Sequence, residues 1–223
     1  MTNSAPSELL KPKAILFDWD NTLVDSWSII FDALNFTLQE FGKEPWTMNQ
    51  TRSRVRKSLR DSFPKMFGDE WKKAADVFYG RFDEIHISNL TPINGAAEML
   101  GDLVNLGVYL GVVSNKRGEY LRKEAQYLGW DKHFSQLVGA LDTANDKPAT
   151  DPVELALSGC AHKRGMDIWF VGDADIDMEC AINAQLAPVL LRAEAPKDDE
   201  FEKHSPIYHL VDCLTLSKMV GNM

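Results

Sequence analysis

Two aspartates stand one residue apart in the segment AILFDWDNTLVD, at Asp18 and Asp20. Carboxylates this close repel each other and raise one another's pKa unless a cation or hydrogen bonds neutralise them. An apolar run that predicts a buried strand leads directly into the pair. The pattern indicates either a metal site or an aspartate that holds a proton for chemistry.

A second acidic group follows another apolar run, in the segment IWFVGDADID, and contains Asp173, Asp175 and Asp177. Magnesium prefers hard oxygen ligands, usually one or two carboxylates together with water and phosphate oxygens. We therefore expect the two strand ends to converge on one cation.

The elements that must position these carboxylates alternate along the chain. Strands are predicted at Ala14 to Asp18, Val108 to Ser114, Leu137 to Ala140, Ile168 to Gly172 and Val189 to Leu191. Amphipathic helices are predicted between them, at Gly95 to Leu106, Glu119 to Leu128 and Pro152 to Gly159. This alternation predicts an α/β fold, a three-layer Rossmann-like parallel sheet with helices on both faces. In such sheets the ligand site lies beyond the carboxyl ends of the strands, where the strand order reverses.

Residues 27–90 interrupt the alternation. They contain no convincing strand, and Ile29, Ile30, Ala33, Leu34 and Leu38 have helical spacing. We expect an α-helical cap domain at 27–90, inserted into a core domain made of residues 1–26 and 91–223.

Composition limits the possible partners. The chain has 223 residues, is 44% hydrophobic and carries a formal net charge of −9, so it can bury a full core but lacks the positive surface that nucleic acid or an anionic membrane requires. No apolar run approaches about 18 residues, and the N-terminus lacks the apolar centre of a secretory signal. We expect a soluble, cytoplasmic protein; the sequence does not indicate its oligomeric state.

The segment from Asp18 to Thr22 resembles the DxDxT signature of the haloacid dehalogenase (HAD) superfamily. Three later segments resemble the other motifs of that family, in the same order: Val113-Ser114-Asn115-Lys116, Lys147-Pro148, and Gly172-Asp173 to Asp177. The resemblance covers nearly the whole chain and is strongest to the phosphoglycolate phosphatase-like branch, which carries a helical cap. Single motifs of this kind are common, but four in order, each after a predicted strand, are specific.

The resemblance implies a Mg²⁺-dependent phosphatase that hydrolyses a small phosphorylated metabolite, a phosphoglycolate-like phosphomonoester. Asp18 would be the nucleophile that forms an aspartyl-phosphate, and Asp20 would protonate the leaving oxygen and later deprotonate water. Thr22 would help to place the nucleophile, although a hydroxyl at this position is also common in turns. The metal ligands would be Asp18, Asp20, Asp173 and Asp177, the last directly or as a supporting carboxylate.

Other residues have two interpretations. Ser114 and Asn115 would hold the transferring phosphoryl group, or they would only cap a helix. Of the two lysines that could neutralise its charge, we choose Lys147 as catalytic and expect Lys116 to be a solvated loop residue, the usual state of lysine. Asp175 is expected to face solvent.

The predicted cap contains the basic segment QTRSRVRKSLRDS, in which Arg52, Arg56 and Arg60 recur every four residues. On one helix these side chains would share a face. They would either form a solvated basic face or, with Arg52 and Arg56 as the binding candidates, contact a carboxylate or second phosphate of the substrate.

Other activities of the same superfamily remain open. A phosphonatase would need a cap lysine that forms a Schiff base, with Lys43 and Lys57 as candidates, and a mutase would return the phosphoryl group to a sugar. A dehalogenase is disfavoured because that branch lacks the second aspartate, here Asp20. A non-catalytic binding protein is disfavoured because every catalytic position is filled.

Overall fold

The computed structural model describes residues 10–197 and 199–223. Its main sheet has six strands in the order β5-β4-β1-β6-β7-β8, and every neighbouring pair is parallel. The strands are β1 (Ala14–Phe17), β4 (Tyr109–Arg117), β5 (Gln136–Ala140), β6 (Ile168–Gly172), β7 (Ala187–Leu191) and β8 (Tyr208–Leu210). The predicted α/β fold class is therefore confirmed.

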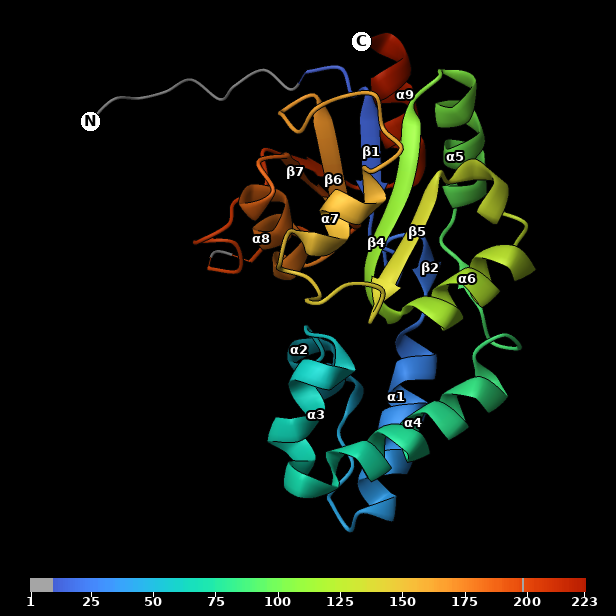
Figure 1. Ribbon diagram of the computed structural model, residues 1–223, viewed down its shortest axis with the longest axis vertical. Coiled ribbons are helices and arrows are strands. Elements are labelled where there is room, and N and C mark those ends of the chain that lie inside the picture. Colours follow the sequence, from blue (N-terminus) through green and yellow to red (C-terminus); the bar gives the residue numbers. More distant parts are fainter. Residues whose placement is uncertain (1–9, 198) are drawn as a thin grey trace.

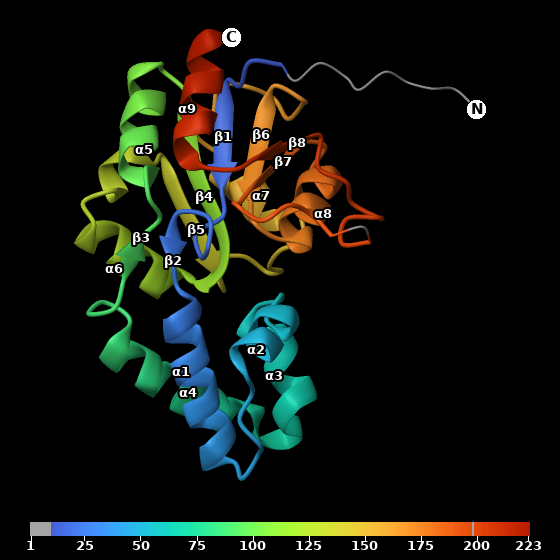
Figure 2. The same cartoon turned by 180° about the vertical axis from the view of Figure 1, so that it is seen from behind.

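Helices cover both faces of this sheet (Figures 1 and 2). One face carries α5 (Ala96–Asn105), α6 (Gly118–Tyr127) and α9 (Cys213–Asn222), and the other carries α7 (Asp151–Ala156) and α8 (Asp175–Asn183). The central strand shows why both layers are needed. Ile15 and Phe17 belong to one core cluster and Ala14 and Leu16 to the other, because successive side chains of a strand point to opposite faces.

Residues 27–85 form a helical layer beyond the carboxyl ends of the strands (Figures 1 and 2). It contains α1 (Trp27–Glu40), α2 (Met48–Arg54), α3 (Leu59–Phe67) and α4 (Trp71–Ile85). The segments that lead into and out of the helical layer pair as a short antiparallel ladder, β2 (Val24–Asp25) with β3 (Thr91–Pro92). Turns of 3₁₀ helix lie at Gly68–Glu70 and Asp131–His133.

The helical layer has an apolar cluster of its own, built around Leu34, Leu38, Phe63 and Phe67. This cluster supports our proposal that residues 27–90 form a separate cap domain. Residues 1–9 of the proposed core domain lie outside the described residues.

The prediction that Arg52, Arg56 and Arg60 share one helix is wrong. Helix α2 ends at Arg54, and Val55 has an extended backbone with φ −82° and ψ 98°. Ser58 is the N-cap residue of α3. Its backbone carbonyl accepts the first helical hydrogen bonds, and its hydroxyl donates to Asp61. The S-x-x-D pattern of a helix start, at residues 58–61, therefore outweighs the four-residue charge spacing.

Short elements at the margins of the sheet were missed. Strand β8 has three residues and completes the edge beyond β7. Strand β4 continues through the predicted end at Ser114 to Arg117. Within the described residues, no helix is long and apolar enough to cross a membrane.

Candidate active site

The polar residues of the four motifs meet at the carboxyl ends of β1, β4 and β6. Strand β1 lies between β4 and β6, so the sheet order reverses there and leaves a crevice beyond the strand ends. A pocket opens at this place, and its lining includes Asp18, Asp20, Ser114, Lys147 and Asp173.

The loop after β1 aims both aspartates into this pocket. Asn21 adopts φ 62°, a left-handed conformation that asparagine tolerates better than most residues. Its backbone N–H donates to the Val24 carbonyl at 2.6 Å, while the Trp19 backbone N–H donates to Asp18 Oδ1 at 2.7 Å. The chain therefore turns sharply, and Asp18 and Asp20 stay at the carboxyl end of β1.

Asp18 shares a buried lysine with Asp177. The Nζ atom of Lys147 lies 2.9 Å from Asp18 Oδ1 and 2.7 Å from Asp177 Oδ1, and its side chain is 1% exposed. Burial alone would lower the pKa of Lys147, but the two carboxylates outweigh it and raise that pKa above its usual value. Lys147 is therefore a fixed positive charge beside the proposed nucleophile.

Three carboxylates form a candidate metal centre. Oxygen atoms of Asp18, Asp173 and Asp177 all lie within 4.8 Å of one another. Burial and the Asp177 charge raise the pKa of Asp18 to about 6, and burial together with Asp177 and Asp18 raises the pKa of Asp173 well above its usual value. One lysine thus leaves this group short of positive charge, and an all-oxygen donor set suits a hard divalent cation.

Gly172 makes this centre sterically possible. A Cβ atom at Gly172 would overlap the side chain of Asp177. Asp177 in turn accepts a hydrogen bond from the backbone N–H of Ala174 at 3.1 Å, at the start of α8. The glycine of the fourth motif therefore lets this carboxylate fold back beneath the strand end.

Asp20 lies outside this carboxylate group. Its Oδ1 atom instead forms an ion pair with Lys116 Nζ at 2.7 Å. We therefore keep Asp20 for proton transfer in the proposal below and leave it out of the metal ligands.

Lys116 contradicts the expectation of a solvated loop residue. Its side chain is 4% exposed because β4 runs on past Ser114 and carries it between Asp20 and Glu124, which lies 2.7 Å from Nζ. The sequence did hold one signal for this group. Glu124 stands on the apolar face of α6 with Leu121 and Ala125, where a solvated carboxylate is not expected.

Thr22, Ser114 and Asn115 all lie at the strand ends. The Thr22 hydroxyl is 3.5 Å from Asp173 Oδ1, and Ser114 Oγ accepts the Lys116 backbone N–H at 3.2 Å. The side-chain amide of Asn115 donates to the Lys147 carbonyl at 3.2 Å, and its Oδ1 atom is buried with no hydrogen-bond partner among the described residues. Binding of a phosphoryl group by Ser114 and Asn115 stays a proposal.

The arginines of the helical layer have different surroundings. Arg56 lines the pocket and lies 3.9 Å from Asp175, which is half-exposed. Arg52 stacks over Trp27, 5.6 Å from the ring centre, and is not part of the pocket lining. Arg60 pairs with the buried Asp146, so it joins the helical layer to the loop that precedes Lys147.

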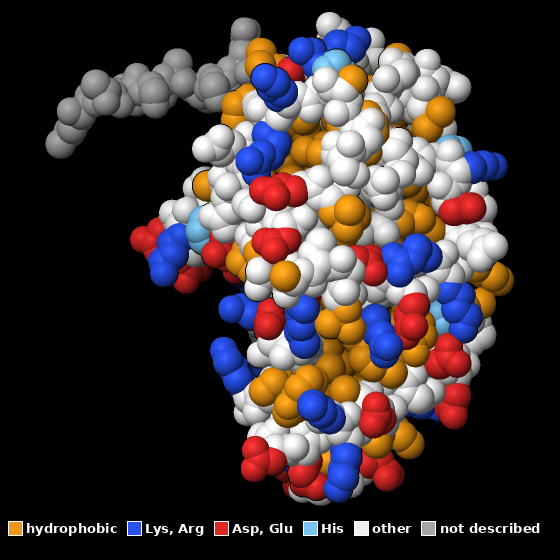
Figure 3. Space-filling view, in the orientation of Figure 1, with side chains coloured by type: hydrophobic (Ala, Val, Ile, Leu, Met, Phe, Trp, Pro, Cys, Tyr) orange, Lys and Arg blue, Asp and Glu red, His pale blue; other side chains and the backbone are white. Residues whose placement is uncertain are grey.

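The side of the pocket away from the strand ends is apolar. The whole pocket includes about 1120 Å³ of empty space, counting space open to solvent. The apolar and aromatic lining that the helical layer contributes is Trp27, Ile30, Leu34, Trp46, Val55, Leu59, Phe63, Met66, Phe78, Tyr79 and Phe82. Figure 3 shows hydrophobic side chains gathered over the helical layer, with Lys and Arg side chains at their margin.

Known proteins resemble this chain along most of its length. The family model of the haloacid dehalogenase-like hydrolases matches residues 15–190. A phosphoglycolate phosphatase of Aquifex aeolicus is 30% identical over 77% of this chain and 81% of that protein. Pyrophosphatase PpaX of Halalkalibacterium halodurans is 24% identical over 93% of this chain and 96% of that protein.

A solved structure agrees in fold. A haloacid dehalogenase-like family hydrolase from Streptococcus pneumoniae superposes with a TM-score of 0.82, covers 94% of this chain and 98% of its own, and is 20% identical. Together with the family match over residues 15–190, which spans all four motifs, this identifies the chain as a member of the haloacid dehalogenase-like hydrolase family.

Proposed function

We propose that this hydrolase is a Mg²⁺-dependent phosphatase of a small phosphorylated metabolite and works through an aspartyl-phosphate on Asp18. The observation that carries the proposal is the position of Asp18, held by Lys147 at 2.9 Å at the edge of an acidic group that is short of positive charge. The relatives named as phosphatases support the same reaction class.

In this mechanism an oxygen of Asp18 attacks phosphorus, and the bond from phosphorus to the leaving oxygen breaks. Asp20 gives its proton to that oxygen, so the product leaves as an alcohol. Asp20 then takes a proton from water, whose oxygen attacks the aspartyl-phosphate and releases inorganic phosphate and Asp18. Lys147, with Ser114 and Asn115, offers positive charge and donors to the phosphoryl oxygens.

Magnesium fits the three carboxylates of Asp18, Asp173 and Asp177, and when bound it would offset their charge and polarise a phosphoryl oxygen. We expect hydrolysis to stop when the protein is treated with a chelator and to return with Mg²⁺. Asp173→Asn should weaken this dependence by raising the Mg²⁺ concentration needed for half-maximal activity. Hydrolysis that is unaffected by chelator would refute the metal site.

For the substrate, a phosphoglycolate-like phosphomonoester agrees with the names of several relatives. The apolar side of the pocket favours, in addition, phosphomonoesters with a larger and partly apolar alcohol, because burial of apolar surface contributes about 25 cal/mol per Å².

A screen of phosphorylated metabolites, with Mg²⁺ present and released phosphate as the measurement, tests the proposal directly. It should include phosphoglycolate, pyrophosphate, sugar phosphates and aromatic phosphomonoesters, with Asp18→Asn as the control for contaminating phosphatases. A purified, folded protein that releases phosphate from none of them, or at the same rate as Asp18→Asn, would contradict the proposal.

Two alternatives within the superfamily have their own tests. Of the two candidate Schiff-base lysines, Lys57 lines the pocket whereas Lys43 stacks over Phe67, 5.7 Å from the ring centre. Borohydride trapping with a phosphonate would label Lys57 if the protein were a phosphonatase. For a mutase, phosphoryl transfer to a sugar phosphate would exceed phosphate release. Location in the cytoplasm stays a prediction.

A further inference from the structure

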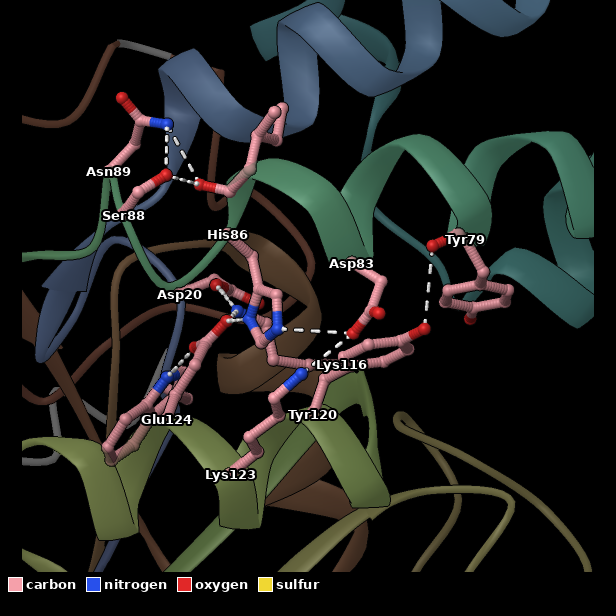
Figure 4. Close-up of polar contacts among 12 residues, drawn as sticks. Asp20, Tyr79, Asp83, His86, Ser88, Asn89, Lys116, Tyr120, Lys123 and Glu124 are labelled. Atoms are coloured by element: carbon pink, nitrogen blue, oxygen red, sulfur yellow. Dashed lines mark hydrogen bonds and ion pairs between the residues drawn. The ribbon is translucent and has the colours of Figure 1, made fainter.

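A second buried polar group lies beside the carboxylate centre, and we call it the Glu124 cluster. It consists of Trp19, Asp20, His86, Lys116 and Glu124. Figure 4 shows His86 and Lys116 pointing toward Glu124, with Asp20 on the other side of the lysine amino group. These five residues come from the loop after β1, the end of α4, the end of β4 and helix α6.

Glu124 is fully buried, and both of its oxygens are saturated with donors. Oε1 accepts from Lys116 Nζ at 2.8 Å and is 2.9 Å from His86 Nδ1. Oε2 accepts from Trp19 Nε1 at 2.7 Å and from Lys116 Nζ at 2.7 Å. Burial raises the pKa of Glu124, but these partners outweigh it and hold the pKa below its usual value. The side chain is therefore an ionised acceptor.

Lys116 transmits this arrangement to Asp20. Its ammonium group donates to both oxygens of Glu124 and forms an ion pair with Oδ1 of Asp20 at 2.7 Å. The group is 4% exposed and lies 5.2 Å from the centre of the Phe82 ring, so water has little access to it. The two hydrogen bonds to Glu124 fix the position of Nζ, and the ion pair holds the Asp20 carboxyl group beside it.

Glu124 also holds the backbone next to Asp20. The Trp19 indole donates to it, and the same ring packs edge-on against Trp130 at 5.9 Å and Phe134 at 6.4 Å. Glu124 thus fixes Asp20 in two ways, through the Lys116 ammonium group and through the side chain of the neighbouring Trp19.

His86 connects this carboxylate to the helical layer. It follows α4 directly, stacks on Phe82 at 4.9 Å and meets Tyr120 edge-on at 5.1 Å. Because an ionised carboxylate only accepts hydrogen bonds, His86 Nδ1 carries the proton in this contact. The segment 86–92, which leads from the helical layer back to the core, is therefore attached to Glu124 through His86.

We propose that Glu124 is a positioning residue for proton transfer: it holds Asp20, through Lys116 and Trp19, in the place from which that carboxyl protonates the leaving group, and His86 ties this place to the helical layer. This inference rests on the acid–base role of Asp20 in the proposed function. A cluster that only stabilises the fold would affect all substrates equally.

Leaving groups of different basicity separate these two roles. An alkyl phosphate needs a proton on its departing oxygen, whereas p-nitrophenolate leaves readily without one. Glu124→Gln keeps the shape but not the charge, and we expect it to lower kcat/KM for the best alkyl phosphate about 10- to 100-fold, a part of the 10²- to 10⁴-fold that general acid catalysis supplies. For p-nitrophenyl phosphate, kcat/KM should fall at most about threefold, since departure of p-nitrophenolate depends little on a general acid.

Two comparisons complete the test. Lys123→Gln removes the exposed Lys123–Asp83 ion pair, 2.8 Å long, which also joins α6 to α4 and should leave both rates unchanged. In an Asp20→Asn background, Glu124→Gln should cause no further loss, because the group it positions is already gone. If Glu124→Gln does not fold, His86→Phe, which keeps the ring stacking, and Trp19→Phe are expected to show the same substrate pattern more weakly.

The possible results are distinct. If Asp20→Asn shows no dependence on the leaving group, the acid role in the proposed function is wrong. If Asp20→Asn shows that dependence but the cluster variants lower both rates equally, or add fully to Asp20→Asn, the positioning role of Glu124 is overturned. Substrate-selective and non-additive losses support it.

Discussion

The two aspartates of the DWD segment have the same kind of neighbour but differ in how many carboxylates surround the shared lysine. Asp18 meets buried Lys147, which meets buried Asp177, and Asp20 meets buried Lys116, which meets buried Glu124. Around Asp18, the third carboxylate of Asp173 adds more negative charge. Around Asp20, the remaining partners of Glu124 are the ring nitrogens of Trp19 and His86.

This difference assigns a different task to each side. The Asp18 side has raised carboxyl pKa values and an unbalanced charge, as expected of the metal centre that we propose there. On the Asp20 side, both oxygens of Glu124 are hydrogen-bonded, and such bonds in a buried network hold the groups that make them in one arrangement. This difference agrees with the roles that we propose, metal binding and attack for Asp18 and proton transfer for Asp20.

The largest effect should come from Asp18→Asn, which removes the nucleophile while keeping the size of the side chain. We expect turnover of every substrate to fall by about 10⁴-fold or more, with the folded structure intact. Asp20→Asn should instead keep measurable activity toward p-nitrophenyl phosphate. Steady-state kinetics and circular dichroism on both variants test this, and a folded Asp18→Asn protein with near wild-type activity would rule out the nucleophile.

The next effect compares the two lysines. Lys147→Met and Lys116→Met each leave buried carboxylates uncompensated, and each should reduce the free energy of unfolding by about 3–5 kcal/mol. Only Lys147→Met concentrates three carboxylates without a positive charge, so Mg²⁺ should raise its Tm more than it raises that of the wild type.

Thermal unfolding at pH 8, with and without Mg²⁺, measures this difference. For Lys116→Met the Mg²⁺-induced rise in Tm should equal that of the wild type, because the cation binds on the other side. Equal responses in the two variants would mean that the two sides are not electrostatically distinct.

The Asp18 side was predictable from sequence because its signals are local. Asp18 and Asp173 each follow an apolar run, and parallel strands bring their carboxyl ends to one edge, so the convergence of these carboxylates is predictable, whereas the choice of Lys147 rests on the family resemblance. The alternation of apolar runs also predicts β1, β4, β5, β6, β7, α5, α6 and α7 to within a few residues, but not β8 or α9.

The Asp20 side is harder to predict because its only sequence signal, Glu124 on the apolar face of α6, does not indicate which residues it meets. Glu124 lies 105 residues from Trp19 and 38 from His86 along the chain, and only tertiary packing joins them. The basic segment of the helical layer shows a second limit of local patterns. Its four-residue charge spacing predicts one helix, but the helix start at Ser58 places Arg56 in the link between α2 and α3.

A smaller effect concerns stability and pH on the Asp20 side. The folded-state pKa of Glu124 lies below its usual value, so its stabilisation is complete above the unfolded-state pKa of about 4.3 and is lost as the pH falls through the folded-state value. At pH 7, Glu124→Gln should therefore cost about 1–3 kcal/mol of unfolding free energy. This cost should shrink as the pH falls below about 4.3.

Urea unfolding of wild type and variant at pH 7, 5 and 3.5 checks this sign. Glu119→Gln is the matched control, because Glu119 is exposed on the same helix and its ion pair is with the partly exposed Arg117. A cost of Glu124→Gln that stays constant over this pH range would show that the charge of Glu124 does not contribute to stability.

The smallest effect concerns the helical layer, which covers the pocket that both Asp18 and Asp20 line. Arg56 lines the pocket and its ion pair with Asp175 is long, at 3.9 Å, so we expect it to meet an anionic end of the substrate. Arg56→Ala should raise KM for phosphoglycolate about tenfold, equivalent to about 1.4 kcal/mol, and leave KM for p-nitrophenyl phosphate nearly unchanged. Arg52→Ala removes an arginine of the same segment that stacks on Trp27 but is not itself part of the pocket lining, and it should change neither value. If Arg56→Ala also changes neither, the substrate is recognised by the apolar lining instead, and a bulky aromatic phosphomonoester should then be the better substrate.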